Sequence, residues 1–253
     1  MVNIFVLSGG YKCYKGADIV YIGHGLMDCK MRSYRSYMGN ALCVAGPQFL
    51  PMEDFPEGVD IVKCGYLGFD NIVEDLDEIE VRRDSVLFAP YNKGEMEAMK
   101  EYVEFVLRKY KVIFRFREDF KEDGEEFCRN FAKFKNFYID NGSGIALKTY
   151  KRAFCMICAA TSSKNTFPML SLCPVIVLPH TLGPNFGVDV DISIGINCKE
   201  WISAKEILRI IDEVYKNLPV WNKKILKYRE ENIYNFGKAS ESLADYLMEK
   251  YQL

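Results

Sequence analysis

Short apolar runs alternate with amphipathic stretches along most of this chain. One such run, Phe154–Cys158, is followed by the polar cluster Thr161–Ser163, a short helical segment at Asn165–Leu172 and a second apolar run at Cys173–Pro179. Both runs are too short for a core helix, and the second is rich in β-branched residues. Continuous apolar runs of this length are typical of strands buried on both faces of a parallel sheet. The stretch therefore predicts a buried strand–helix–strand unit.

The same alternation continues on both sides of this unit. Further strands are predicted at Val2–Leu7, Asp18–Ile22, Ala41–Ala45, Ile61–Cys64, Ser85–Ala89, Val112–Arg115, Phe137–Ile139 and Val188–Ile196. Further helices are predicted at Asp28–Tyr37, Glu95–Lys109, Phe120–Phe134, Gly144–Lys151, Ser203–Lys216, Leu218–Glu231 and Ala239–Tyr251. Strands that alternate regularly with helices form a doubly wound parallel sheet, so the predicted fold class is α/β.

An acidic segment, Glu74–Glu80, separates the first four predicted strands from the rest of the chain. A change in charge pattern of this kind indicates a domain boundary. We therefore expect a reduced N-terminal α/β domain over residues 1–74, a larger parallel-sheet domain over residues 75–235 and a C-terminal helix over residues 236–253.

Composition and charge exclude several classes of protein. The chain has 253 residues, of which 49% are apolar and 27% charged, and its net charge is −2. A protein held to nucleic acid by a basic field would be strongly positive, so no nucleic-acid partner is expected. No apolar run approaches the ~20 residues that cross a bilayer, and the N-terminus lacks a signal-peptide core. We therefore expect a cytoplasmic protein.

The helix predicted at Leu218–Glu231 leaves one question of location open. It mixes Trp221 and Ile225 with several lysines. A solvated helix face explains these charges. The alternative is a peripheral contact with the anionic inner face of a membrane.

Two patterns suggest metal sites but have simpler explanations. Nine cysteines include one Cys-x-x-Cys, at Cys155 and Cys158, and no second pair completes a zinc site. We therefore expect buried, reduced thiols. Asp189 and Asp191 form an Asp-x-Asp like the metal-binding pair of some glycosyltransferases, but they also fit the polar face of the half-exposed strand predicted at Val188–Ile196.

The cluster Thr161–Ser163 lies where a strand ends and a helix begins. There Ser162 or Ser163 can cap the helix with its side-chain oxygen. The free N–H groups of a helix N-terminus, with the helix dipole behind them, also attract phosphate. The sequence alone does not decide whether this cluster is a helix cap or a phosphate-binding site.

Six short motifs, taken in their order and spacing, resemble those of the CDP-glycerol glycerophosphotransferase family and of related teichoic-acid and capsule-polymer transferases. They are Tyr21–Gly25 with Lys30, Leu42–Pro47, Gly65–Asp70, Val86–Pro90, Ile113–Arg117, and Thr161–Ser163 with Cys173–Ile176. The resemblance implies a GT-B architecture, in which two Rossmann-like domains face each other across a cleft. Residues 1–74 would then be the acceptor side, and residues 75–235 would bind the nucleotide diphosphate.

The resemblance also implies roles for individual residues. His24 lies between glycines at a predicted strand end and can act near neutral pH as the base for an acceptor hydroxyl. The residues expected to bind the nucleotide or its phosphates are Pro90, Arg115, Arg117, Thr161, Ser162 and Ser163, and further cleft residues are Gly25, Asp28 and His180. The alternatives are that His24 is a loop residue without chemistry and that the two arginines pair with Glu118 or Asp119 at the surface.

The implied function is the transfer of a glycerol-phosphate or sugar unit from a nucleotide-diphosphate-activated donor to a polysaccharide, teichoic-acid-like or glycolipid acceptor. Such a reaction needs a base and neutralisation of the leaving phosphates, so no cofactor and no metal are expected. Phe116 or Arg117 stands where the family has a second histidine tied to the donor. A degenerate nucleotide-binding or subunit protein is therefore the alternative. The N-terminal part is shorter than in the family, which leaves a partner chain or an oligomer open.

Overall fold

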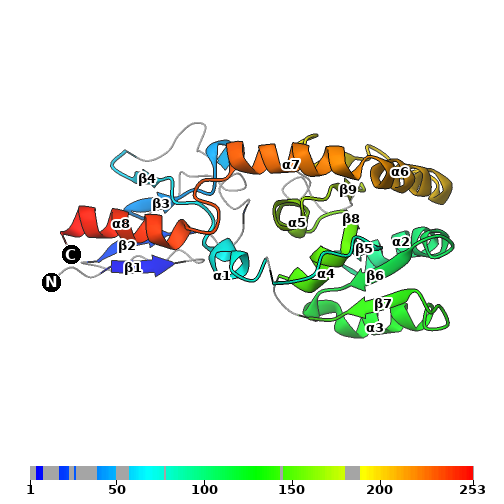
Figure 1. The fold of residues 1–253 in the computed structure, drawn as a ribbon. Coiled ribbons are helices and arrows are strands. Elements are labelled where there is room, and N and C mark those ends of the chain that lie inside the picture. Colours follow the sequence, from blue (N-terminus) through cyan, green and yellow to red (C-terminus); the bar gives the residue numbers. More distant parts are fainter. Residues whose placement is uncertain are drawn as a thin grey trace. The chain divides into compact units, whose positions relative to one another are not determined.

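The computed structural model describes residues 4–7, 17–22, 26, 39–49, 57–76, 78–142, 145–179 and 189–252. The chain forms two compact units, Met1–Glu78 with Tyr228–Leu253, and Ile79–Lys227. Each unit contains a parallel sheet, with four strands in the first and six in the second (Figure 1). The predicted α/β class is confirmed. The C-terminal helix groups with the first unit, and the limits of the folding domains stay a prediction.

The six-stranded sheet has the strand order of a Rossmann fold. Its strands are β5 (Ser85–Ala89), β6 (Lys111–Arg115), β7 (Phe137–Asp140), β8 (Ala153–Cys158), β9 (Val175–Val177) and β10 (Gly195–Asn197). They are ordered β7-β6-β5-β8-β9-β10, and every neighbouring pair is parallel. The carboxyl ends of the strands therefore share one edge of the sheet, as predicted. The order changes direction between β5 and β8, which makes these two strands the topological switch point.

Helices cover both faces of this sheet (Figure 1). One face is covered by α2 (Lys93–Val106), α3 (Lys121–Arg129) and α6 (Ala204–Lys216), and the other by α4 (Leu147–Arg152) and α5 (Ser163–Ser171). Every residue of β5 and β8 is buried, which explains why both strands read as continuous apolar runs. The predicted cap of α6 is confirmed, because the Ser203 side chain accepts a hydrogen bond from the Glu206 N–H at 3.2 Å.

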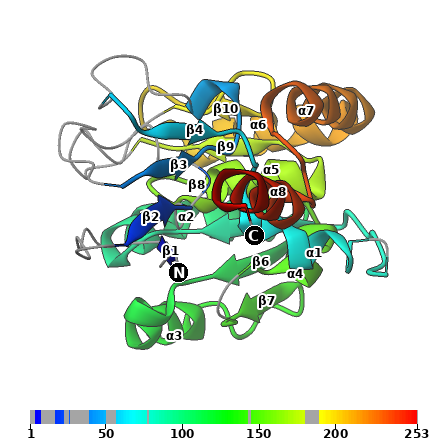
Figure 2. The same cartoon turned by 90° about the vertical axis from the view of Figure 1, so that its left-hand side faces the viewer.

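The four-stranded sheet of the first unit packs against the C-terminal helix. Its strands, β1 (Ile4–Leu7), β2 (Asp18–Tyr21), β3 (Ala41–Cys43) and β4 (Asp60–Val62), lie in chain order and are all parallel. Leu243 of α8 (Ala239–Tyr251) belongs to a core cluster with residues of β2, β3 and β4. Figures 1 and 2 show α8 beside this sheet. Asp70, the first residue of α1 (Asp70–Val73), accepts hydrogen bonds from the N–H groups of Ala239 and Ser240 at 3.1 and 2.6 Å. This motif aspartate therefore caps α8.

The remaining helix, α7 (Leu218–Asn232), begins in the second unit and ends in the first. No helix among the described residues combines the length and the apolar character that crossing a bilayer requires. The predicted helix at Asp28–Tyr37 lies outside the described residues.

The strand predicted at Val188–Ile196 is wrong. Residues 192–194 form a turn, and β10 begins only at Gly195. The Asp191 carboxylate accepts a hydrogen bond from the Ser193 N–H at 2.7 Å, which favours a turn over an extended backbone. Ile192, which the alternation placed on the buried face, is 81% exposed. Asp189 forms an ion pair with Lys199, and the described residues contain no cluster of three potential metal ligands.

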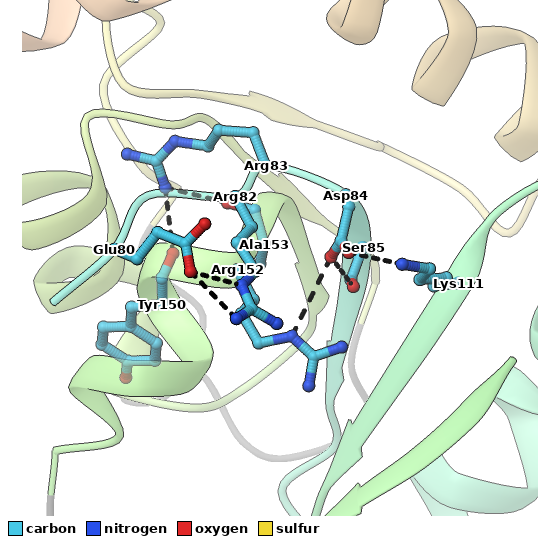
Figure 3. Close-up of polar contacts among 9 residues, drawn as sticks. All are labelled: Glu80, Arg82, Arg83, Asp84, Ser85, Lys111, Tyr150, Arg152 and Ala153. Atoms are coloured by element: carbon cyan, nitrogen blue, oxygen red, sulfur yellow. Dashed lines mark hydrogen bonds and ion pairs between the residues drawn. The ribbon is translucent and has the colours of Figure 1, made fainter.

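A partly buried guanidinium fixes the amino-terminal edge of the six-stranded sheet. Arg83, just before β5, donates from Nη1 to the carbonyl oxygens of Tyr150 and Ala153 at 3.0 and 3.1 Å (Figure 3). Its Nη2 donates to the carbonyl oxygen of Ser171. These three carbonyls lie in α4, at the start of β8 and at the end of α5, so one side chain joins three elements. Arg82, by contrast, pairs only with Glu80 among the contacts drawn, and both side chains are exposed (Figure 3).

Replacing Arg83 with alanine should destabilise the second unit by about 2–3 kcal/mol, because three carbonyl oxygens lose charge-assisted hydrogen bonds. Urea unfolding followed by circular dichroism measures this change. Arg82→Ala is the matched control and should change stability by no more than about 0.5 kcal/mol, since exposed ion pairs contribute little. Equal effects of the two substitutions would contradict the role assigned to Arg83.

Candidate functional site

The loops that follow β5 and β8 form the candidate site. In doubly wound sheets, ligands bind outside the carboxyl ends of the strands at the point where the strand order reverses. Here that point is occupied by Pro90–Asn92, which leads into α2, and by Ala159–Ser162, which leads into α5. The predicted residues Pro90 and Thr161–Ser163 are therefore brought to the same edge of the sheet.

Glu95 joins these two loops. Its carboxylate accepts hydrogen bonds from the Tyr91 N–H at 2.7 Å and from the Ala160 N–H at 3.2 Å. The Asn92 side chain accepts in turn from the Glu95 N–H at 3.0 Å and caps α2. Glu95 is only 5% exposed, so these bonds form in a water-poor environment. Glu95 was not among the predicted site residues, although Asn-x-x-Glu before an amphipathic helix is the spacing of a capping box.

The hydroxyl cap predicted from Ser162 or Ser163 at the start of α5 is provided by Thr161 instead. Ser162 occupies the N-cap position, but its side chain makes no capping hydrogen bond within the described residues. The Ser163 N–H instead donates to the Thr161 hydroxyl at 3.3 Å. The side chain of Ser163 hydrogen-bonds to the buried hydroxyl of Tyr150. Ser162 is exposed, so its hydroxyl is the one that a ligand at this helix N-terminus can reach.

Lys164 is a buried cation in the first turn of the same helix. It is 4% exposed, and among the described residues its Nζ has no hydrogen-bond partner. Burial lowers the pKa of Lys164, and the nearby Cys158, Asp189 and Glu95 oppose that shift. Lys164 was not among the predicted site residues either. The sequence did contain a signal, since Lys164 directly follows the Thr-Ser-Ser cluster at the start of a predicted helix. A positive charge is unfavourable at a helix N-terminus, so a lysine at this position needs an explanation.

The two predicted phosphate-binding arginines lie in different environments. Arg115 forms an ion pair with Asp140, its partner in the β6–β7 register, at 2.7 Å. Both side chains are largely buried, with exposed fractions of 14% and 17%. Asp140 also accepts hydrogen bonds from Thr149 and from the Gly142 N–H. Although burial raises the pKa of Asp140, these bonds and the Arg115 charge bring it below its usual value.

Arg117 lies beyond the end of β6 and is more accessible. It pairs with Asp119, as the surface alternative predicted, and both side chains are exposed. Its guanidinium carbon also lies 4.7 Å from the ring centroid of Tyr91, which follows Pro90. Arg117 is thus next to the β5 loop, whereas Arg115 is held by Asp140. The phosphate-binding roles of both arginines stay predictions.

The other predicted site residues, His24, Gly25, Asp28 and His180, lie outside the described residues. The general base and the additional cleft residues therefore also stay predictions.

Solved structures with a similar fold were found at low sequence identity. A variant of the wall teichoic acid polymerase TagF is 11% identical, with a TM-score of 0.63, and the match covers 99% of this chain and 73% of that one. A putative UDP-N-acetylglucosamine 2-epimerase from Listeria monocytogenes is 13% identical, with a TM-score of 0.62 and coverages of 95% and 69%. MurG from Acinetobacter baumannii is 14% identical, with a TM-score of 0.52 and coverages of 92% and 67%. No protein-family model and no curated protein matches the chain.

Identities this low establish the fold and nothing finer. The two parallel sheets, and the Rossmann strand order of the larger one, agree with the architecture of these proteins. The predicted resemblance is therefore confirmed at the level of the fold, and the chain has the GT-B fold of glycosyltransferases.

Proposed function

We propose that this chain is a transferase that moves a glycerol-phosphate or sugar unit from a nucleotide-diphosphate-activated donor to a polymer or glycolipid acceptor of the cell envelope. The proposal rests on one observation above all. The N-terminus of α5 lies at the switch point of a Rossmann-type sheet, with an exposed Ser162 and a buried, unpaired Lys164 in the described structure. Helix N-termini in this position bind phosphate groups.

The chemistry of transfer requires that the charge of the leaving nucleoside diphosphate be neutralised. The dipole and N–H groups of α5 supply part of this. Arg117 is the better placed of the two arginines, because its exposed pair with Asp119 contributes little to stability and can be exchanged for a phosphate. To bind a phosphate, Arg115 would have to separate from the largely buried Asp140 carboxylate. Breaking that buried pair costs more free energy than breaking the exposed pair of Arg117. The proposal assigns the acceptor base to His24 and requires no metal.

The alternative is a nucleotide-binding protein that has lost transfer activity. Phe116, one of the two residues that stand where the family has its second histidine, is 4% exposed and belongs to the core of the second unit. Its ring lies so close to Gly124 that a Cβ at that glycine would be 2.3 Å from it. The residue at this position thus packs inward, and no imidazole replaces the missing one there. This observation favours binding without turnover.

Binding of a nucleoside diphosphate tests the site. We expect CDP, UDP, ADP or GDP to raise the melting temperature of the protein, because a ligand that binds the folded state stabilises it. Ser162→Leu should weaken that binding at least tenfold, about 1.4 kcal/mol, by blocking the helix N-terminus. Ser162→Ala, which removes only the hydroxyl, should have a smaller effect. Unchanged affinity in Ser162→Leu would place the phosphates elsewhere.

Turnover tests the role of His24. His24→Ala should reduce the release of nucleotide from the donor, in the presence of a polymer primer, by roughly 10²–10⁴, the usual contribution of a positioned base. Donor affinity should hardly change, since the phosphates are assigned to the other unit. His180→Ala serves as the comparison. An active His24→Ala protein would move the base to another residue, and a wild type that binds donors but turns over none would support the alternative.

A further inference from the structure

The first turn of α5 contains buried donors without acceptors. The Nζ of Lys164 and the Nδ2 of Asn165 are both buried, and within the described part of the chain neither has a hydrogen-bond partner. A buried ammonium without a partner costs several kcal/mol, because it has given up its hydration. The helix dipole adds to that cost, since positive charge is unfavourable at a helix N-terminus. Lys164 therefore opposes the stability of the fold as it stands.

The surroundings of Lys164 do not remove this cost. Its charged and titratable neighbours are Cys158 at the end of β8, Glu95 of α2 and Asp189 before β10. The Glu95 carboxylate is already engaged by the N–H groups of Tyr91 and Ala160. Asp189 forms its ion pair with Lys199. Burial also raises the pKa of the Cys158 thiol, so this neighbour is neutral at ordinary pH. None of these groups pairs directly with the ammonium.

We propose that Lys164 is a phosphate-binding residue whose acceptor is the diphosphate of the bound nucleotide, and that this binding takes up a proton. The proposal rests on the function proposed above. A diphosphate brings acceptor oxygens and further negative charge to a buried donor that has no hydrogen-bond acceptor among the described residues. The bound diphosphate also pairs with the Lys164 ammonium, whose charge is otherwise unfavourable at the start of α5.

Nucleotide binding changes the protonation of Lys164 in a direction that follows from its pKa in the empty site and in the complex. In the empty site, burial lowers the pKa of Lys164 below its usual value of 10.5. A phosphate next to the ammonium raises that pKa again. At a pH between the two values, the lysine is partly neutral in the empty protein and charged in the complex. Affinity should therefore fall as the pH rises through the pKa of the empty site.

Lys164→Met tests the charge directly. Methionine is an unbranched apolar side chain that can occupy the buried space of the lysine. We expect the variant to keep or raise its urea midpoint, to bind the nucleoside diphosphate at least tenfold more weakly, and to take up no proton on binding. Calorimetry in two buffers of different ionisation enthalpy at pH 8.5 counts the protons. The probe is CDP or ADP, whose bases do not titrate between pH 7.5 and 9.5. Lys205→Met, at an exposed position of α6, is the matched control and should resemble wild type.

Lys164→Arg provides a second test if the methionine variant does not fold. Arginine keeps its charge throughout this range, so the variant should bind without proton uptake and with an affinity independent of pH from 7.5 to 9.5. A pH profile identical to that of wild type would overturn the proposal.

The remaining outcomes separate this proposal from the proposed function. If wild type binds CDP or ADP and Lys164→Met binds them equally well, Lys164 is a structural counter-charge to Glu95, and the inference fails while the function stands. If Lys164→Met binds weakly but wild type takes up no proton, the coupling is overturned. If wild type binds no nucleoside diphosphate, both proposals are overturned.

Discussion

The carboxylate of Glu95 is the interaction on which the candidate site depends. It accepts hydrogen bonds from the N–H of Tyr91 after β5 and from the N–H of Ala160 after β8. One side chain therefore links the two loops at the point where the strand order reverses. Hydrogen bonds to a charged group each contribute about 1.5–3 kcal/mol to the stability of the fold. A buried charged group that loses them also leaves its desolvation cost uncompensated. Without this link, the pairing of β5 with β8 would still align the two strands, but the Glu95 side chain would no longer connect the loops that follow them, which contain the residues assigned to the phosphates.

The two edges of the six-stranded sheet differ in how completely their polar groups are satisfied. At the amino-terminal edge, Arg83 donates to three carbonyl oxygens, and the Asp84 carboxylate accepts hydrogen bonds from Lys111 and Ser85 (Figure 3). The Nε of Arg152 has no hydrogen bond there among the described residues, but it lies 3.9 Å from the Asp84 carboxylate. At the carboxyl edge, Lys164 has no partner among the described residues, and Ser162 is exposed. Buried polar groups are normally paired, and Lys164, unpaired among the described residues, lies at the edge where ligands bind in such sheets, which is the basis of the phosphate site proposed above. This contrast, more than the fold, supports ligand binding at that edge.

The sequence predicted the parts of the fold that local pattern controls. The boundaries of β5 and α8 match the predicted ranges, because a continuous apolar run and an amphipathic period are local features. The apolar–polar alternation at Val188–Ile196 predicted a strand that the structure does not have. The Asp191 side chain stabilises a turn there, and periodicity does not detect such a turn. The Arg115–Asp140 pair depends on the register of two strands, and the burial of Lys164 depends on which segments pack around it. Neither can be read from a single sequence, whereas the Asn92–Glu95 capping box could have been.

No histidine stands at the end of β6, where the transferase family that the sequence resembles has one, and this changes how a donor could be held. With Phe116 in the core, the end of β6 offers Arg117, which is permanently charged and exposed, in place of an imidazole that titrates near neutral pH. Lys164 adds a second cation whose pKa is lowered by burial. In the site proposed above, the group whose protonation changes when the donor binds is Lys164. Donor binding would then depend on pH through Lys164, whereas a pH dependence of turnover near neutrality would come from the acceptor base assigned to His24.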